Sequence, residues 1–218
     1  MLSKLDRGQE ALREYDKAIK INPEDPEYHF SKGSLLRYLA IYDEAFFECN
    51  QAIRLDPNNK MYRRWKINAL MDMEHFEEAL DEINKLPPNY LDVTKANILN
   101  KLNRYGEALQ ISLWLIENRS EGRWAKNFRR IAGYYKLEAE SLLGLDRYAE
   151  ALIAYDRAIY FNPDNPRNHG SKATVLRKMH RYEEAVIEYD EALKLDPENS
   201  LYLHYRDMVL DKLNNDTF

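Results

Sequence analysis

Residues 7–26 read RGQEALREYDKAIKINPEDP, and residues 147–166 read RYAEALIAYDRAIYFNPDNP, identical at eleven of twenty positions. The phrase returns at 181–200 as RYEEAVIEYDEALKLDPENS and at 41–60 as IYDEAFFECNQAIRLDPNNK. Its alanines and closing prolines recur at a spacing of 34 residues: Ala11 and Ala45, Ala151 and Ala185, Pro23 and Pro57, Pro163 and Pro197. A period of this length indicates stacked structural repeats, and it governs the interpretation of the remaining sequence.

Each phrase has the pattern of one amphipathic helix. Ala11, Tyr15 and Ala18 lie at i, i+4 and i+7, on one helical face. An Asn-Pro or Asp-Pro pair then predicts the end of the helix, because proline lacks the amide hydrogen and disfavours helix in the preceding residue. Apolar-periodic stretches such as 27–39 and 167–179 predict a second helix before each phrase. One helix pair cannot bury its apolar face alone, so neighbouring pairs are expected to stack.

The pattern resembles the tetratricopeptide repeat, which has a small residue in its first helix and two alanines in its second. The complete triplets are Gly33/Ala45/Ala52, Ala139/Ala151/Ala158 and Ala173/Ala185/Ala192. An aromatic residue also recurs at the start of the second helix: Tyr42, Phe76, Tyr105, Tyr148 and Tyr182. The resemblance covers nearly the whole chain. It implies an all-α, right-handed superhelical solenoid of antiparallel helix pairs, with about six repeats and a terminal helix.

The repeat phase predicts a single domain over residues 1–218. Its expected repeats are 1–25 (partial), 26–59, 60–88, 89–121, 122–165 and 166–199, followed by a terminal helix at 200–214. The spacing of the alanines is irregular at the centre, where Ala108 follows Ala79 by 29 residues and precedes Ala151 by 43. The extra residues hold no proline, and they predict a lengthened first helix from about Gly122 to Leu143.

Composition limits the function classes. The chain has 32 Lys+Arg against 37 Asp+Glu, a net charge of −5, which argues against a general nucleic-acid-binding protein. No apolar run reaches the roughly 18 residues of a membrane span, and the N-terminus lacks the apolar core of a signal peptide. The single cysteine, Cys49, cannot form an internal disulfide. These features predict a soluble protein of a reducing compartment, the cytoplasm.

Catalytic motifs are absent from the sequence. It has no Gly-rich phosphate loop, no pair of histidines spaced for a metal and no Gly-x-Ser-x-Gly turn. His29 and His169 share a repeat position, which favours a packing role for both. Cys49 replaces a tyrosine of the sister repeats, and we interpret it as a small buried apolar residue. We therefore expect no enzyme, no cofactor and no metal site. The alternative is a targeting or regulatory region of a larger enzyme.

Members of the family commonly bind an extended peptide or a partner helix on the concave face formed by their first helices. The resemblance places eight polar candidates on that face: Arg37, Arg64, Asn68, Asn97, Asn100, Arg129, Lys136 and Arg177. The same phase adds Phe30, Ser34, Trp65, Val93, Thr94, Glu140, Ser171 and Thr174. The side-chain amides of Asn68 and Asn97 can each donate a hydrogen bond to a peptide backbone and accept one from it. We expect a protein or peptide ligand, acidic or C-terminal; the other interpretation is a merely solvated surface.

Some family members hold the C-terminal carboxylate of chaperones with Lys-x-x-x-Asn, a second Asn and Lys-x-x-x-Arg on three successive first helices. Arg64 and Asn68 resemble the first pair. Thr94 replaces the middle asparagine, and Gly133 and Leu137 replace the last pair. With two cationic contacts missing, we do not expect the standard carboxylate-binding site.

Two other features support alternative interactions. Residues 119–136 carry six basic residues against one acidic residue, with aromatic side chains between them, a pattern that also suits binding to nucleic acid. The alternative is an exposed helix on which the long Arg and Lys side chains cover apolar neighbours. The partial first repeat and the apolar terminal helix predict end-to-end self-association through a heterologous contact. The alternative is that the two ends are plain caps of the solenoid or are covered by further repeats. The apolar residues of the terminal helix are Leu201, Tyr202, Tyr205, Met208, Val209, Leu210 and Leu213.

Overall fold

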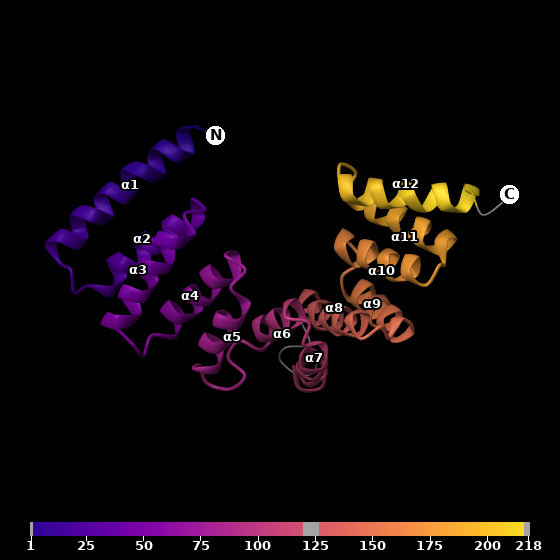
Figure 1. The fold of residues 1–218 in the computed structure, drawn as a ribbon, viewed down its shortest axis with the longest axis horizontal. Coiled ribbons are helices and arrows are strands. Elements are labelled where there is room, and N and C mark those ends of the chain that lie inside the picture. The colour runs from indigo at the N-terminus through magenta and orange to yellow at the C-terminus, as the bar shows by residue number, and fades with distance from the viewer. Residues whose placement is uncertain (1, 120–126, 216–218) are drawn as a thin grey trace. The chain divides into compact units, whose positions relative to one another are not determined.

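The computed structural model describes residues 2–119 and 127–215, and the side chains of residues 7–118 and 127–214. These residues form twelve α-helices and no β-strand, which confirms the predicted all-α helical repeat fold (Figure 1). The chain divides into two compact units, Met1–Leu91 and Asp92–Phe218, and each is described by itself. A single domain over the whole chain stays a prediction. None of the described helices combines the length and apolar character that a membrane crossing requires.

The helices follow the predicted order of first and second helices. The first unit contains α1 (Leu2–Ile21), α2 (Pro26–Tyr38), α3 (Tyr42–Leu55), α4 (Lys60–Asp72) and α5 (Phe76–Asn84). The second unit contains α6 (Asp92–Lys101), α7 (Tyr105–Arg119), α8 (Phe128–Gly144), α9 (Tyr148–Phe161), α10 (Pro166–Lys178), α11 (Tyr182–Leu195) and α12 (Ser200–Asn215). Helices α2/α3, α4/α5, α6/α7, α8/α9 and α10/α11 pack as pairs.

Two predicted helix boundaries are wrong. Helix α8 begins at Phe128, because the Asn127 side chain accepts the amide hydrogen bond of Arg130 and caps the helix there. It still has 17 residues against 13 in α10, so it is lengthened. The predicted segment from Gly122, with Trp124 and Lys126, lies outside the described residues. The partial first repeat predicts the end of a first helix and then a second helix at residues 8–21, but α1 starts at Leu2, so the residues before 8 continue the same helix.

Three first helices begin at a side-chain cap. Asp25, Asn59 and Asn165 share a repeat position, and each accepts a hydrogen bond from the amide two residues later, at 3.0 to 3.2 Å. In α2 and α10 a proline follows the cap, at a position where its missing amide hydrogen costs nothing. The Pro-x-x-Pro phrase that ends one second helix therefore also starts the next first helix.

Small residues bring the two helices of a repeat together. The predicted alanines of the complete triplets are fully buried. A Cβ atom on Gly33 would lie 3.2 Å from the carbonyl oxygen of Ala45 and 3.2 Å from the Cβ of Glu48, so α2 and α3 leave little room for a larger residue. In the second unit, Ala173, Ala185 and Ala192 belong to one buried core that extends from Leu109 to Val209.

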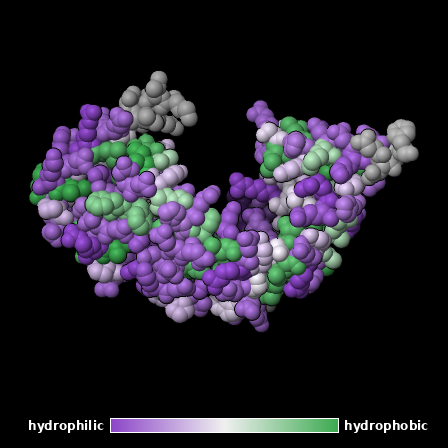
Figure 2. All heavy atoms as spheres, in the orientation of Figure 1, coloured by the Kyte–Doolittle hydropathy of each residue, from purple (hydrophilic) through white to green (hydrophobic). Residues whose placement is uncertain are grey.

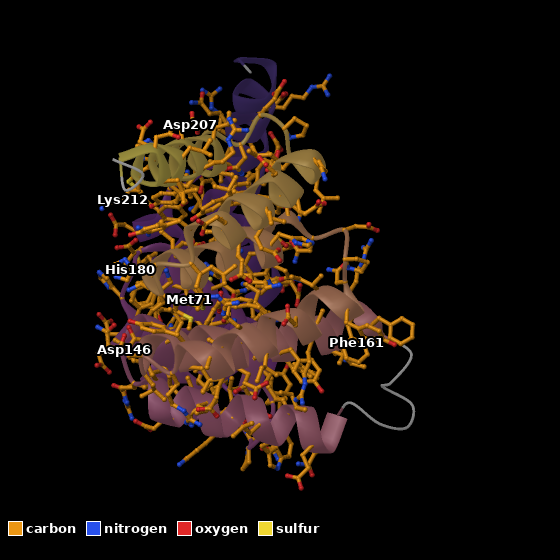
Figure 3. All side chains as sticks on the ribbon, turned by 90° about the vertical axis from the view of Figure 1, so that its right-hand side faces the viewer. Met71, Asp146, Phe161, His180, Asp207 and Lys212 are labelled. Atoms are coloured by element: carbon orange, nitrogen blue, oxygen red, sulfur yellow. The ribbon has the colours of Figure 1, made fainter. Side chains whose placement is uncertain are left out.

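A left-handed residue turns the chain between the helices of each pair. Ala40, Glu74, Asn103, Asp146 and His180 share a repeat position and have φ angles from 58° to 61°. The hydroxyls of Tyr105, Tyr148 and Tyr182 hydrogen-bond to the side chains of the last three, two residues earlier. In these three repeats the recurring aromatic residue therefore also holds the turn, a contact that Phe76 at the same position cannot make because it has no hydroxyl. In Figure 3, Asp146 and His180 lie along one edge of the second unit, and Phe161 lies on the opposite edge.

Glutamates on α3, α5 and α11 connect these second helices to their own first helices. The carboxylate oxygens of Glu48 lie 2.6 Å from His29 Nδ1 and 2.6 Å from Lys32 Nζ. The Glu188 carboxylate makes the same contacts with His169 and Lys172, which occupy the same repeat positions. The two histidines therefore have the structural role that their repeat position predicts. Cys49 is buried as expected, and burial raises the pKa of its thiol to about 11.

The glutamate of the third repeat has three basic partners where the other two glutamates have two. The Glu82 carboxylate on α5 accepts hydrogen bonds from Arg63 and Lys66 of α4, both at 2.9 Å, and from Lys85 at 2.8 Å. Burial alone would raise the pKa of this carboxyl, but the hydrogen bonds from Lys85, Lys66 and Arg63 outweigh it and lower the pKa to about 2. The charged form is therefore stabilised by folding.

The surface visible in Figure 2 is mostly hydrophilic in both units, with hydrophobic side chains in small separate groups. Isolated exposed apolar residues such as Phe47, Ile153 and Ile187 are normal on a folded surface and imply no site by themselves.

Ala185→Leu is expected to lower the free energy of unfolding by roughly 1–3 kcal/mol, because the added atoms overpack the contact between α10 and α11. Glu183→Ala, on the exposed side of α11, is the control and should change it by less than about 0.5 kcal/mol. Urea denaturation measures both. An Ala185→Leu protein as stable as the wild type would contradict the assigned repeat phase.

Glu82→Gln is expected to lower the free energy of unfolding by roughly 2 kcal/mol at pH 7. Because the folded pKa of about 2 lies below the ordinary value of 4.5, the stabilisation is present above pH 4.5 and is lost as the pH falls toward 2. The difference between variant and wild type should shrink over that window in urea denaturation. Glu77→Gln, exposed on the same helix, is the control. A difference that is constant with pH would refute the assignment.

Candidate functional site

Three first helices of the second unit, α8, α10 and α12, border an open cavity. It has a volume of about 370 Å³, within the range of ligand-binding pockets. Helices α8 and α10 contribute Lys136, Glu140, Arg167, Gly170, Ser171 and Thr174. Tyr189 of α11, Asn199 of the following turn, and Leu201, Tyr202 and Tyr205 of α12 complete the lining. The cavity is therefore built from three successive first helices over one residue of a second helix.

The α8 side of the cavity carries an ion pair. Lys136 Nζ lies 3.0 Å from a carboxylate oxygen of Glu140, and both side chains are about one-third exposed, at 32% and 33%. Arg167 is exposed, and its side chain makes no hydrogen bond or ion pair with the described residues. Two cations and one carboxylate thus face the opening, with the Arg167 guanidinium free to receive an anionic group.

Polar groups deeper in the cavity bond to one another. The Thr174 hydroxyl donates to the carbonyl oxygen of Gly170 at 3.0 Å, and it lies 3.2 Å from the hydroxyl of Tyr189. The Asn199 side chain donates to Asp196 at 2.8 Å and accepts the amide of Tyr202 at 3.3 Å. The side chains of Thr174, Tyr189 and Asn199 thus already take part in hydrogen bonds within the protein.

The same cation–aromatic contact joins successive first helices in both units. The guanidinium of Arg37 lies 5.1 Å from the ring centre of Trp65, and that of Arg177 lies 5.2 Å from the ring centre of Tyr205. The two arginines share one repeat position, and the two aromatic residues share another. Arg37 also forms an ion pair with Asp72. Both arginines are thus held against the neighbouring first helix.

Two family models, each described as tetratricopeptide repeat, match residues 2–60 and 166–199. The chain carries tetratricopeptide repeats. These repeats are protein–protein interaction modules. A search of curated protein sequences finds no match.

Solved structures of tetratricopeptide-repeat proteins share the fold. A thermophilic protein from Thermus thermophilus, TTC0263, is 18% identical, with a TM-score of 0.64, over 85% of this chain and 99% of its own. YrrB, described as having an unusual peptide-binding site, is 19% identical, with a TM-score of 0.58, over 88% and 97%. A protein from Parabacteroides merdae ATCC 43184 is 14% identical, with a TM-score of 0.67, over 95% and 80%. At these identities the likeness concerns the fold.

The structure of these tetratricopeptide repeats brings four of the predicted groove residues together. Lys136, Glu140, Ser171 and Thr174 all line the cavity, as the repeat phase predicts for α8 and α10. The sequence analysis missed Arg167 and the residues of α12. A signal existed for Tyr205 alone, because it follows the predicted groove residue Ser171 by 34 residues. Arg167, Leu201 and Tyr202 lie at repeat positions that the predicted groove did not include.

The other predicted groove residues differ in whether their side chains already have a hydrogen-bond partner. Arg64 is exposed and Asn68 half-buried on α4, and neither side chain bonds to a described residue. The side chains of Asn97 on α6 and Arg129 in the first turn of α8 are equally without a partner among the described residues. Asn100 instead accepts a hydrogen bond from the Ser141 hydroxyl at 2.9 Å, which connects α6 to α8. Their contact with a ligand stays a prediction.

The alternative interactions also stay predictions. Much of the basic segment 119–136 lies outside the described residues, and Arg129 and Arg130 are exposed. On α12, Tyr202 and Val209 are buried, whereas Leu201, Leu203 and Leu210 remain exposed. End-to-end association would use that exposed surface.

Arg37→Gln is expected to lower the free energy of unfolding by about 1 kcal/mol, because it removes the contact with Trp65 and the pair with Asp72. Arg64→Gln, the control on α4, should change it by less than about 0.5 kcal/mol. Thermal and urea denaturation of both variants test this. Equal stability of the two variants would show that the Arg37 contacts contribute nothing.

Proposed function

We propose that this protein binds an extended segment of a partner protein across its first helices, as an adaptor, scaffold or co-chaperone-like protein. The cavity of α8, α10 and α12 carries the proposal, because four residues that the repeat phase assigns to a ligand-binding face line it. The unusual peptide-binding site of YrrB supports it by analogy, since that protein shares the fold.

The charges favour an acidic or C-terminal peptide. Lys136 and Arg167 outnumber Glu140 at the cavity, and Arg64 is exposed and unpaired among the described residues of its unit. Cations of this kind attract a carboxylate in a chain whose net charge is otherwise −5. The half-buried amides of Asn68 and Asn97 suit a peptide backbone, which presents both donors and acceptors.

Peptides selected from a displayed random library against the full chain test the proposal. The enriched sequences should be rich in Asp and Glu or depend on a free C-terminus. Lys136→Glu should weaken their binding about tenfold or more in fluorescence polarisation, because it places a second carboxylate beside Glu140. Added salt should weaken wild-type binding as well, since it screens exposed charges.

Lys194→Glu is the matched control. It makes the same charge change on the second helix α11, where Lys194 is exposed and pairs only with Glu191 among the described residues. Its effect on peptide binding should be less than twofold. A library without enriched sequences would contradict the proposal, as would peptides insensitive to both Lys136→Glu and Arg64→Glu.

A further inference from the structure

Gly170 occupies a position that carries a side chain on the preceding first helices. The equivalent residues are Phe30 on α2, Arg64 on α4, Val93 on α6 and Lys136 on α8. Gly170 is buried and lines the cavity. The space that a side chain fills on those helices is therefore left to the residues of α12 and to the cavity.

The ring of Tyr202 lies directly on Gly170. A Cβ atom built on this glycine would be 2.4 Å from Cε1 and 2.9 Å from Cζ of the ring, distances at which one of them must move. The contacted atoms are the far end of a rotatable side chain, so the ring can yield. Tyr202 is only 8% exposed and borders the cavity, which offers the ring space to move into. Gly170 thus controls how much of the cavity is open.

The interior of the cavity favours an apolar group. Leu201, with 54% of its surface exposed, and the rings of Tyr202 and Tyr205 form the α12 side. The Thr174 and Asn199 side chains of the lining are already bonded to protein groups. A polar ligand group beside those two side chains would lose its water without gaining a free partner, whereas an apolar side chain against Leu201 and the two rings gains by leaving water.

We propose that the cavity holds one large aliphatic or aromatic side chain of the bound peptide, and that Gly170 sets the size it accepts. The inference rests on the proposed peptide-binding function and names the ligand class for that site. Arg167 at the opening then receives a carboxylate from the residue beside the apolar one. The preferred segment is a large apolar residue next to an acidic residue.

The probes are three peptides of the form acetyl-Ser-Gly-X-Asp-Gly-Ser-amide, with Phe, Leu or Ala at X. Titration of the isotope-labelled full chain, followed by ¹⁵N–¹H NMR, gives the affinities. The wild type should bind the Phe and Leu peptides about tenfold more tightly than the Ala peptide, with shifts concentrated on α10 and α12. In Gly170→Ala the displaced Tyr202 ring should remove that preference and leave the Ala peptide unchanged.

Gly133→Ala is the matched control, because a Cβ atom on that exposed glycine of α8 meets nothing within 4 Å. It should leave all three affinities unchanged. Leu201→Ala is a second variant that does not depend on the tolerance of α10 for a methyl group. It should reduce the preference for Phe over Ala severalfold, and the melting temperatures of all three variants show whether each is folded.

Two results would overturn the inference. If the preference for Phe over Ala survives in both Gly170→Ala and Leu201→Ala while Lys136→Glu weakens all three peptides, the cavity takes no apolar anchor, although peptide binding itself stands. If the wild type binds the three peptides equally or not at all, the inference also fails. The selection from the displayed library then tests the proposed function separately, because its random peptides are not chosen to contain a large apolar residue.

Discussion

The close approach of the two helices in each repeat is the constraint on which the rest of the structure depends. Fully buried alanines such as Ala173 and Ala185 allow the backbones of α10 and α11 to pack at short distance. A close pair buries one face and leaves the other for the next pair, so the repeats stack. Stacking aligns the first helices α8, α10 and α12, and the cavity exists because they lie side by side.

Buried charge secures this packing in some repeats, and aromatic packing replaces it in another. In the sixth repeat Glu188 binds His169 and Lys172 of its first helix. In the fifth repeat Tyr135 replaces the histidine and stacks on Phe161, with ring centres 5.7 Å apart. Glu138 replaces the lysine there, and burial raises the pKa of its carboxyl. The repeat therefore tolerates different chemistry where the helix contact itself is kept.

The candidate site could be predicted where it follows the repeat phase alone. Lys136 and Thr174 both line the cavity, and both lie at repeat positions assigned to the ligand-binding face. The repeat phase also assigned Arg37 and Arg177 to the ligand-binding face. It does not show which side chains of the next first helix contact them. Whether such a cation is free depends on the aromatic residue that the next first helix presents, Trp65 in one unit and Tyr205 in the other.

The sequence by itself determined the all-α repeat fold, the helix pairs and most of their boundaries, because helix periodicity, alanine spacing and Asx-Pro turns act over a few residues. It was wrong where a local signal was faint, as at the cap of α8, where the single residue Asn127 starts the helix. Only the tertiary structure decided that the ring of Tyr202 covers Gly170 and that a cavity opens beside it. Those features depend on side chains from helices far apart in the sequence, whose contacts are set by packing and not by any local pattern.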